Sequence, residues 1–83
     1  MKIRILFFSI LQDLVGTSEI EEVLPQDRKW RVSDLLERLY ARYEGLSDWD
    51  GKILVALDRE YVDREKELAD GQELAIMPPV QGG

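Results

Sequence analysis

The chain contains neither cysteine nor histidine among its 83 residues. These absences exclude a disulfide framework, a zinc site of the cysteine–histidine kind, a thiol nucleophile and a histidine general base. Basic residues are few, because the chain has 11 lysines and arginines but 17 aspartates and glutamates, which gives a net charge of −6. A nucleic-acid-binding domain needs the opposite balance, because contacts with phosphates supply most of its affinity. We therefore expect no nucleic-acid partner.

Long apolar runs are also missing, although apolar residues make up 45% of the chain. The longest runs span only a few residues, which is too short to cross a membrane. The stretch after Met1-Lys2-Ile3-Arg4 is too short for a signal peptide and has no small-residue cleavage site. A chain of this length forms one domain with a small core. The sequence therefore predicts a single soluble, cytoplasmic domain without a membrane partner.

Motifs for chemistry on side chains are scarce as well. The six glycines are scattered, so there is no glycine-rich phosphate loop. Asp48-Trp49-Asp50-Gly51 has the start of a calcium-binding loop, but the later ligands and the terminal glutamate are missing. A charged turn before a strand explains this segment better. The other carboxylates alternate with lysine and arginine, which is typical of a solvated face, and we expect no metal site and no active site in the interior.

Apolar patterning bounded by turn residues predicts five strands. They cover residues 3–10, 18–24, 53–57, 61–62 and 73–77. The segment 11–15 is interpreted as a loop between the first two strands. The first and last strands are rich in apolar residues on both faces, so we expect them to be neighbours at the centre of the sheet.

One helix is expected, because six apolar side chains recur at helical spacing and share one face. They are Val32, Leu35, Leu36, Leu39, Tyr40 and Tyr43. Ser33 can cap the helix, although the start could equally lie two residues earlier, and Gly45 ends it. A mixed sheet covered on one face by a single helix is an α+β roll.

The end of the sequence is its most unusual feature. The last predicted strand is followed by Pro78 and Pro79, then Val80-Gln81, then Gly82-Gly83. The prolines stiffen the exit from the sheet, and glycines without a Cβ can enter a narrow channel. Residues 80–83 reach at most about 13–14 Å when extended. We therefore divide the chain into a domain of residues 1–79 and an extended tail of residues 80–83.

Such a tail presents its α-carboxylate. A carboxylate is a poor electrophile, so it must become an acyl-adenylate or a thioester before a nucleophile can take it. The tail could also have no role, but its sequence favours a carrier whose reactive group is the carboxylate of Gly83, with Gly82 allowing another protein's site to close around it. Any sulfur would then be carried at Gly83, which agrees with the absence of cysteine.

Over its whole length the chain resembles the small subunit of molybdopterin synthase, a ubiquitin-like sulfur carrier. The ending Pro78-Pro79-Val80-Gln81-Gly82-Gly83 is the most specific part of the resemblance. Weaker matches are Ile5-Leu6-Phe7-Phe8, Leu14-Val15-Gly16-Thr17, Leu35-Leu36, Val55-Ala56-Leu57, Tyr61-Val62 and Leu68-Ala69-Asp70-Gly71. The resemblance implies a ubiquitin-like β-grasp fold.

The resemblance also implies a reaction sequence. An adenylyltransferase like those that activate ubiquitin uses ATP to adenylate Gly83, and a sulfur donor protein converts the adenylate into a thiocarboxylate. The tail then enters the large subunit, where the sulfur passes to cyclic pyranopterin monophosphate to build the molybdopterin dithiolene. The family assembly is a heterotetramer of two small and two large subunits. The small subunit itself binds no cofactor, is not catalytic alone and leaves the catalytic side chains to the large subunit.

A partner-binding set follows from the same resemblance. Phe8, Tyr61 and Met77 match a face that contacts the large subunit in the family, although all three could instead be core residues. The tail residues Pro78, Pro79, Val80 and Gln81 complete the set.

Three alternatives remain open. Sulfur carriers of thiamine thiazole synthesis and of tRNA thiolation share the fold and the Gly-Gly end, but thiamine carriers usually lack the Pro-Pro pair seen at Pro78-Pro79. A ubiquitin-like protein modifier would form a bond from Gly83 to a lysine of its target. A plain interaction module would not need Gly82-Gly83.

Overall fold

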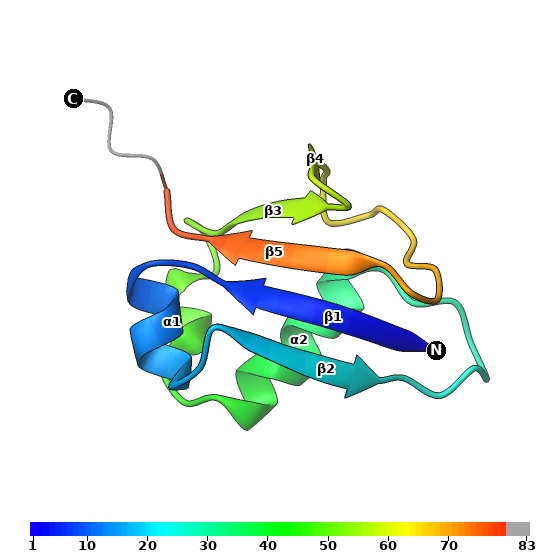
Figure 1. Cartoon of the computed structure of the whole chain (residues 1–83), viewed down its shortest axis with the longest axis horizontal. Helices are drawn as coiled ribbons and strands as arrows, with labels where there is room; N and C mark the ends of the chain where they lie inside the picture. The colour runs from blue at the N-terminus through cyan, green and yellow to red at the C-terminus, as the bar shows by residue number, and fades with distance from the viewer. Residues whose placement is uncertain (80–83) are drawn as a thin grey trace.

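The computed structural model describes residues 1–79 and contains a five-stranded mixed sheet in the order β2-β1-β5-β3-β4. One long helix covers one face of the sheet, and two short helices lie at its edge (Figure 1). The elements are β1 (Lys2–Phe7), α1 (Ile10–Val15), β2 (Glu19–Val23), α2 (Val32–Arg42), the 3-10 helix η1 (Leu46–Trp49), β3 (Leu54–Leu57), β4 (Glu60–Tyr61) and β5 (Glu73–Met77). The predicted α+β arrangement is confirmed.

The first and last strands lie side by side in the sheet, as predicted. They run parallel, with Ile5 opposite Leu74 and Phe7 opposite Ile76. All other strand pairs described within residues 1–79 are antiparallel. Because β1 and β5 are parallel, their carboxyl ends meet at the same edge of the sheet, where the Phe8 amide donates to the Ile76 carbonyl at 3.2 Å.

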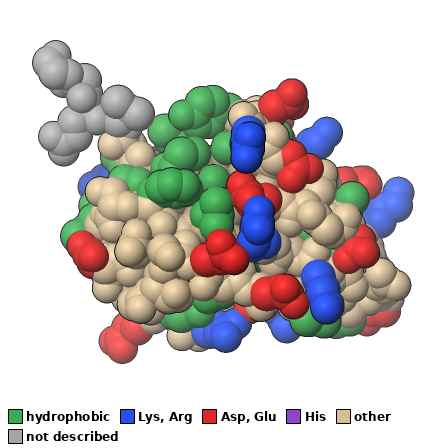
Figure 2. All heavy atoms as spheres, in the orientation of Figure 1, with side chains coloured by type: hydrophobic (Ala, Val, Ile, Leu, Met, Phe, Trp, Pro, Cys, Tyr) green, Lys and Arg blue, Asp and Glu red, His purple; other side chains and the backbone are tan. Residues whose placement is uncertain are grey.

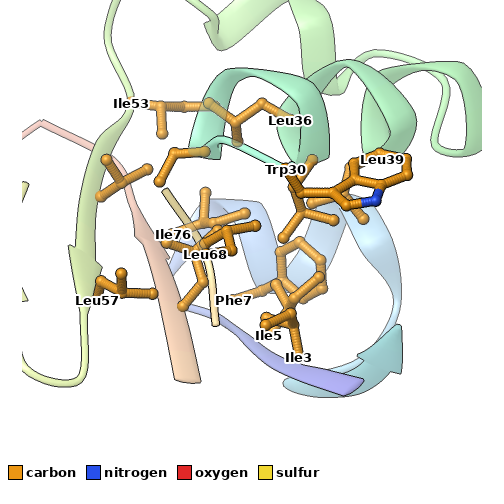
Figure 3. Close-up of a cluster of buried hydrophobic side chains, with 14 of the residues drawn as sticks. Ile3, Ile5, Phe7, Trp30, Leu36, Leu39, Ile53, Leu57, Leu68 and Ile76 are labelled. Atoms are coloured by element: carbon orange, nitrogen blue, oxygen red, sulfur yellow. The ribbon is translucent and has the colours of Figure 1, made fainter. Parts of the chain in front are cut away.

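The core lies between the sheet and α2 (Figure 3). Alternate residues of β1 and β5 point into it, and their side chains are almost fully buried. The helix contributes Val32, Leu35, Leu36 and Leu39 from its predicted apolar face, while Tyr40 and Tyr43 lie partly buried at its border. Burial of each large aliphatic side chain stabilises the fold by about 1.5–3 kcal/mol.

The prediction for residues 8–15 is wrong in detail. The first strand ends at Phe7 instead of residue 10, and α1 occupies the segment interpreted as a loop. Leu11 is buried, and Gly16 ends this helix with a φ of 91° and an amide that donates to the Gln12 carbonyl at 2.8 Å. A helix of six residues is too short for its period to stand out beside an apolar strand.

The start of α2 also differs from the prediction. Ser33 lies inside the first turn, and the residue that caps the helix is Arg31. The Arg31 amide donates to Oδ2 of Asp34 at 2.8 Å. The amides of Val32 and Ser33 donate to carbonyls of the segment before Leu68, at 3.0 and 2.9 Å, so the free N–H groups of the first turn find partners outside the helix.

Gly45 has the left-handed backbone expected of it, with a φ of 88°. It lies beyond the end of α2, however, because Tyr43 is the capping residue, and it begins η1. Leu46 then turns back into the core and is fully buried. Among residues 1–79, no helix is both long and apolar enough to cross a membrane.

Candidate functional site

Apolar side chains gather on the sheet face that α2 leaves uncovered. Strand register places Leu6, Ala75, Ala56 and Tyr61 in one row across β1, β5, β3 and β4. A second row contains Met77 opposite Leu54, with Phe8 following the end of β1. These seven residues form what we call the outer apolar face. Figure 2 shows hydrophobic side chains gathered on this face near the end of the described chain, with charged side chains beside them.

The three family-matched residues lie together on the outer apolar face. Phe8 and Tyr61 expose 44% and 71% of their surface, so neither is a core residue. Met77 is half-buried between its strand neighbours. Sequence reasoning missed Leu6, Leu54 and Ala75, although each occupies the strand position alternate to a buried residue, a signal that would have found them.

An ion pair and a tight turn border this face. Arg4 and Glu73 lie opposite each other in the β1–β5 register and form a salt bridge. The hydrogen bond to Glu73 raises the pKa of the Arg4 guanidinium above its ordinary value. In the two-residue turn between β3 and β4, Asp58 and Arg59 both have positive φ, and Oδ1 of Asp58 accepts from the Glu73 amide at 3.0 Å. The turn thereby holds Tyr61 on the sheet, opposite Ala56 of β3.

The described chain ends beside a hollow at the carboxyl edge of β1 and β5. Pro78 is half-buried and Pro79 is exposed, directly after the last strand. The hollow has a volume of about 360 Å³, and its lining residues are Ser9, Ile10, Trp49, Pro78 and Pro79. The predictions for Val80, Gln81, Gly82 and Gly83 concern positions outside the described residues.

A cluster of polar side chains on the helix side has a structural role. Oδ1 of Asp50 accepts from the Tyr40 hydroxyl at 2.7 Å and from the Arg64 guanidinium. The bond from Tyr40, followed by that from Arg64, lowers the pKa of Asp50, and burial raises the pKa of Tyr40 well above its ordinary value. The cluster ties α2 to two loops. Within residues 1–79, no group of three or more carboxylates is placed to hold a metal ion.

The chain is similar to small sulfur carriers and to a small archaeal modifier protein. The ThiS family model matches residues 5–83. The molybdopterin synthase sulfur carrier subunit of Escherichia coli is 35% identical, over 98% of this chain and 99% of the relative. A Pyrococcus furiosus structure described as a putative molybdopterin converting factor, subunit 1, is 31% identical, with a TM-score of 0.83 over 96% of this chain and 99% of its own. SAMP1 from Haloferax volcanii is 27% identical, with a TM-score of 0.83 over the full length of both chains. These likenesses confirm the ubiquitin-like β-grasp fold.

Proposed function

Because this chain belongs to the ThiS family, we propose that it is the sulfur-carrier subunit of a molybdopterin synthase and that Gly83 carries the sulfur. The match to the Escherichia coli sulfur carrier subunit over nearly the whole of both chains supports this role. The observation that carries the proposal is the outer apolar face, which extends to the residues from which the Pro-Pro-Val-Gln-Gly-Gly ending departs.

The chemistry takes place at the carboxylate of Gly83. An adenylyltransferase transfers AMP from ATP to a carboxylate oxygen and releases pyrophosphate. Hydrosulfide delivered by a donor protein then displaces AMP from the acyl-adenylate, and the product is a thiocarboxylate in which sulfur replaces one oxygen. This sulfur attacks a carbon of cyclic pyranopterin monophosphate and forms a thioester. Water then cleaves the bond between the sulfur and the Gly83 acyl carbon, which leaves the sulfur on the pterin and restores the carboxylate. Two thiocarboxylated carriers act in turn because a dithiolene contains two sulfur atoms.

The large subunit supplies the catalytic side chains in this proposal. The carrier has no cysteine or histidine with which to act as nucleophile or general base. Its own part is to dock and to deliver the carboxylate in the correct position. The proposed assembly is a heterotetramer of two carriers and two large subunits.

The outer apolar face is the proposed docking surface for the large subunit. Exposed aromatic side chains often dominate the binding energy of an interface, and truncating one weakens binding by about 2 kcal/mol, or about thirtyfold in dissociation constant. We expect Tyr61→Ala to weaken large-subunit binding by this amount in calorimetry while leaving the melting temperature unchanged, because Tyr61 is 71% exposed. Met77→Ala should weaken binding too, with some loss of stability.

Val23→Ala is the matched control for docking, because Val23 is 60% exposed on β2, at the far edge of the sheet from β4. Its affinity for the large subunit should equal that of the wild type. If Tyr61→Ala and Met77→Ala both bind with wild-type affinity, the assignment of the docking surface is wrong.

The carrier role is tested at the last residue. Incubation with the activating enzyme, ATP and a sulfur source should yield an intact mass in which one oxygen has become sulfur. Deleting Gly83 moves the carboxylate inward by about 3.3–3.6 Å, and a misplacement of an ångström can lower a rate about a hundredfold. We therefore expect the deletion, and equally the addition of one residue after Gly83, to abolish dithiolene formation while the melting temperature is unchanged. Normal dithiolene formation by the deletion variant would refute the carrier role.

A protein modifier is the second candidate, because SAMP1 is a small archaeal modifier protein and is similar over the whole chain. Sulfur carriers for thiamine thiazole or tRNA thiolation would share the thiocarboxylate. The mass of the C-terminal fragment isolated from the native host separates carriers from modifiers. A carrier ends in a free carboxylate or thiocarboxylate, whereas a modifier is recovered with its last glycine bonded to a lysine of another protein.

A further inference from the structure

The hollow at the carboxyl edge of β1 and β5 is separate from the outer apolar face and has its own chemistry. None of its five lining residues is charged, in a chain of which 34% is charged. Ile10 exposes 44% of its surface there, although it is a large aliphatic residue. Trp49 is half-buried and packs on the core with part of its surface while lining the hollow with another part.

The walls of the hollow continue the strands that carry the outer apolar face. Ser9 follows Phe8 directly, and Pro78 follows Met77. The apolar surface therefore turns around the end of the sheet, toward α1 and η1, at the point where the chain continues into residues 80–83. The backbone of Ser9 bends the chain between β1 and α1. Its φ of 56° and ψ of −131° are a combination that L-residues rarely adopt.

We propose that this hollow receives an apolar side chain from the rim of the large-subunit channel that holds residues 80–83. The inference rests on the proposed function. Four extended residues span at most about 13–14 Å, so a protein that encloses Gly83 must bring its surface within that distance of Pro79. Pro79 is itself part of the hollow's lining. A rim this close to Pro79 can reach the hollow, and the uncharged lining calls for an apolar contact.

This second contact has a distinct consequence for delivery of the carboxylate. The outer apolar face holds the partner on the side of the sheet away from α2, and the hollow holds it at the end of the sheet, beside α1 and η1. Contacts on both sides fix the direction in which the tail leaves Pro79, which a single apolar face would leave free to pivot. This direction matters because the reacting carboxylate lies four residues beyond Pro79, so a small change of angle at Pro79 displaces the carboxylate from its correct position.

The test compares Ile10→Ser with Val23→Ser, since both remove an exposed β-branched side chain and only Ile10 lines the hollow. We expect Ile10→Ser to weaken large-subunit binding about fivefold to tenfold and Val23→Ser to leave it unchanged, with both melting temperatures near that of the wild type. Trp49→Leu, which keeps an apolar core contact, should weaken binding as Ile10→Ser does. Wild-type affinity of both hollow variants would overturn the proposal.

Other occupants of the hollow give different results. If the effect of Ile10→Ser on binding vanishes in a chain truncated after Pro79, the occupant is the tail itself, and the proposal is overturned. If Ile10→Ser instead changes self-association in sedimentation while binding is unchanged, the occupant is a second copy of the chain, and the proposal is overturned as well. Tyr61→Ala, measured in parallel, shows which proposal has failed. If neither Tyr61→Ala nor Ile10→Ser weakens binding, the docking role itself has failed. If Tyr61→Ala weakens binding and Ile10→Ser does not, only the proposal for the hollow has failed.

Discussion

Glu22 is a charged side chain buried in the fold, only 4% exposed. From the sequence it looks like one of several solvated glutamates in the second strand. In the structure it shares the inner side of β2 with Ile20, and its carboxylate accepts from Arg38 and Arg42, which lie one turn apart on α2. Residues on a strand and on a helix supply this triad, so its pairing could not be foreseen from local pattern. It joins the edge strand to the helix.

At this residue we expect Glu22→Gln to lower the free energy of unfolding by about 1–2 kcal/mol, because hydrogen bonds to charged groups are worth about 1.5–3 kcal/mol and the two half-exposed arginines regain water. Urea denaturation measures the change. Glu21→Gln is the control, since Glu21 is the exposed neighbour on the opposite side of the strand and should give no more than about 0.5 kcal/mol. Equal effects of the two substitutions would contradict a special role of Glu22.

At the scale of elements, the strength of the local pattern decided what the sequence could predict. The long helix was recognisable because its apolar period persists over enough residues, and the strand 73–77 because its apolar run lies between turn residues. Helix α1 was missed because six residues do not establish a period. The central pairing of β1 with β5 followed from their two apolar faces, whereas the hollow joins α1, η1 and the prolines, which only the tertiary fold brings together.

The start of α2 makes a pH-dependent contribution to stability. The hydrogen bond from the Arg31 amide, followed by that from Arg28, lowers the pKa of Asp34 below its ordinary value. A carboxyl with a lowered folded-state pKa stabilises the fold above its unfolded pKa of about 3.9, and this stabilisation is lost as the pH falls through the folded value. We therefore expect Asp34→Asn to be less stable than the wild type at pH 7, with the difference shrinking below about pH 4.

Thermal unfolding between about pH 2.5 and pH 7 measures this difference. Asparagine can still accept a hydrogen bond from the Arg31 amide. The part of the stability difference that varies with pH therefore comes from the ionised carboxylate of Asp34 and its salt bridge with Arg28. Glu37→Gln, at an exposed position of the same helix, is the control and should stay close to the wild type. A difference for Asp34→Asn that stays constant over this pH range would contradict the capping role of the charge.

On the scale of the whole molecule, an apolar and an acidic surface adjoin, because Tyr61 of the outer apolar face lies within the acidic segment. The outer apolar face occupies the sheet beside the prolines, and the segment of residues 58–73 has seven acidic and three basic residues, a local charge of −4. The family resemblance selected Phe8, Tyr61 and Met77, and only the folded sheet shows that they share one face with Leu6 and Leu54. Strand pairing between distant segments determines that surface.

In the proposed function the large subunit binds a phosphorylated pterin, and a phosphate calls for a positively charged pocket. We therefore expect the acidic segment to speed encounter with the large subunit. The association rate measured by stopped flow should fall as ionic strength rises, while the dissociation rate changes little. Neutralising Glu60 and Asp63 together should lower the association rate at low salt and remove part of its salt dependence. An association rate that does not respond to ionic strength would rule out steering.

The strand nearest the tail, β5, joins the two halves of the sheet, since β1 and β2 lie on one side of it and β3 and β4 on the other. During translation both halves are therefore made before the strand that unites them. The outer apolar face includes Ala75 and Met77 of β5, so this face is complete only when β5 has joined the sheet. A chain that ends before β5 lacks part of the proposed docking surface. If the outer apolar face docks a partner as proposed, docking selects chains in which the sheet is complete.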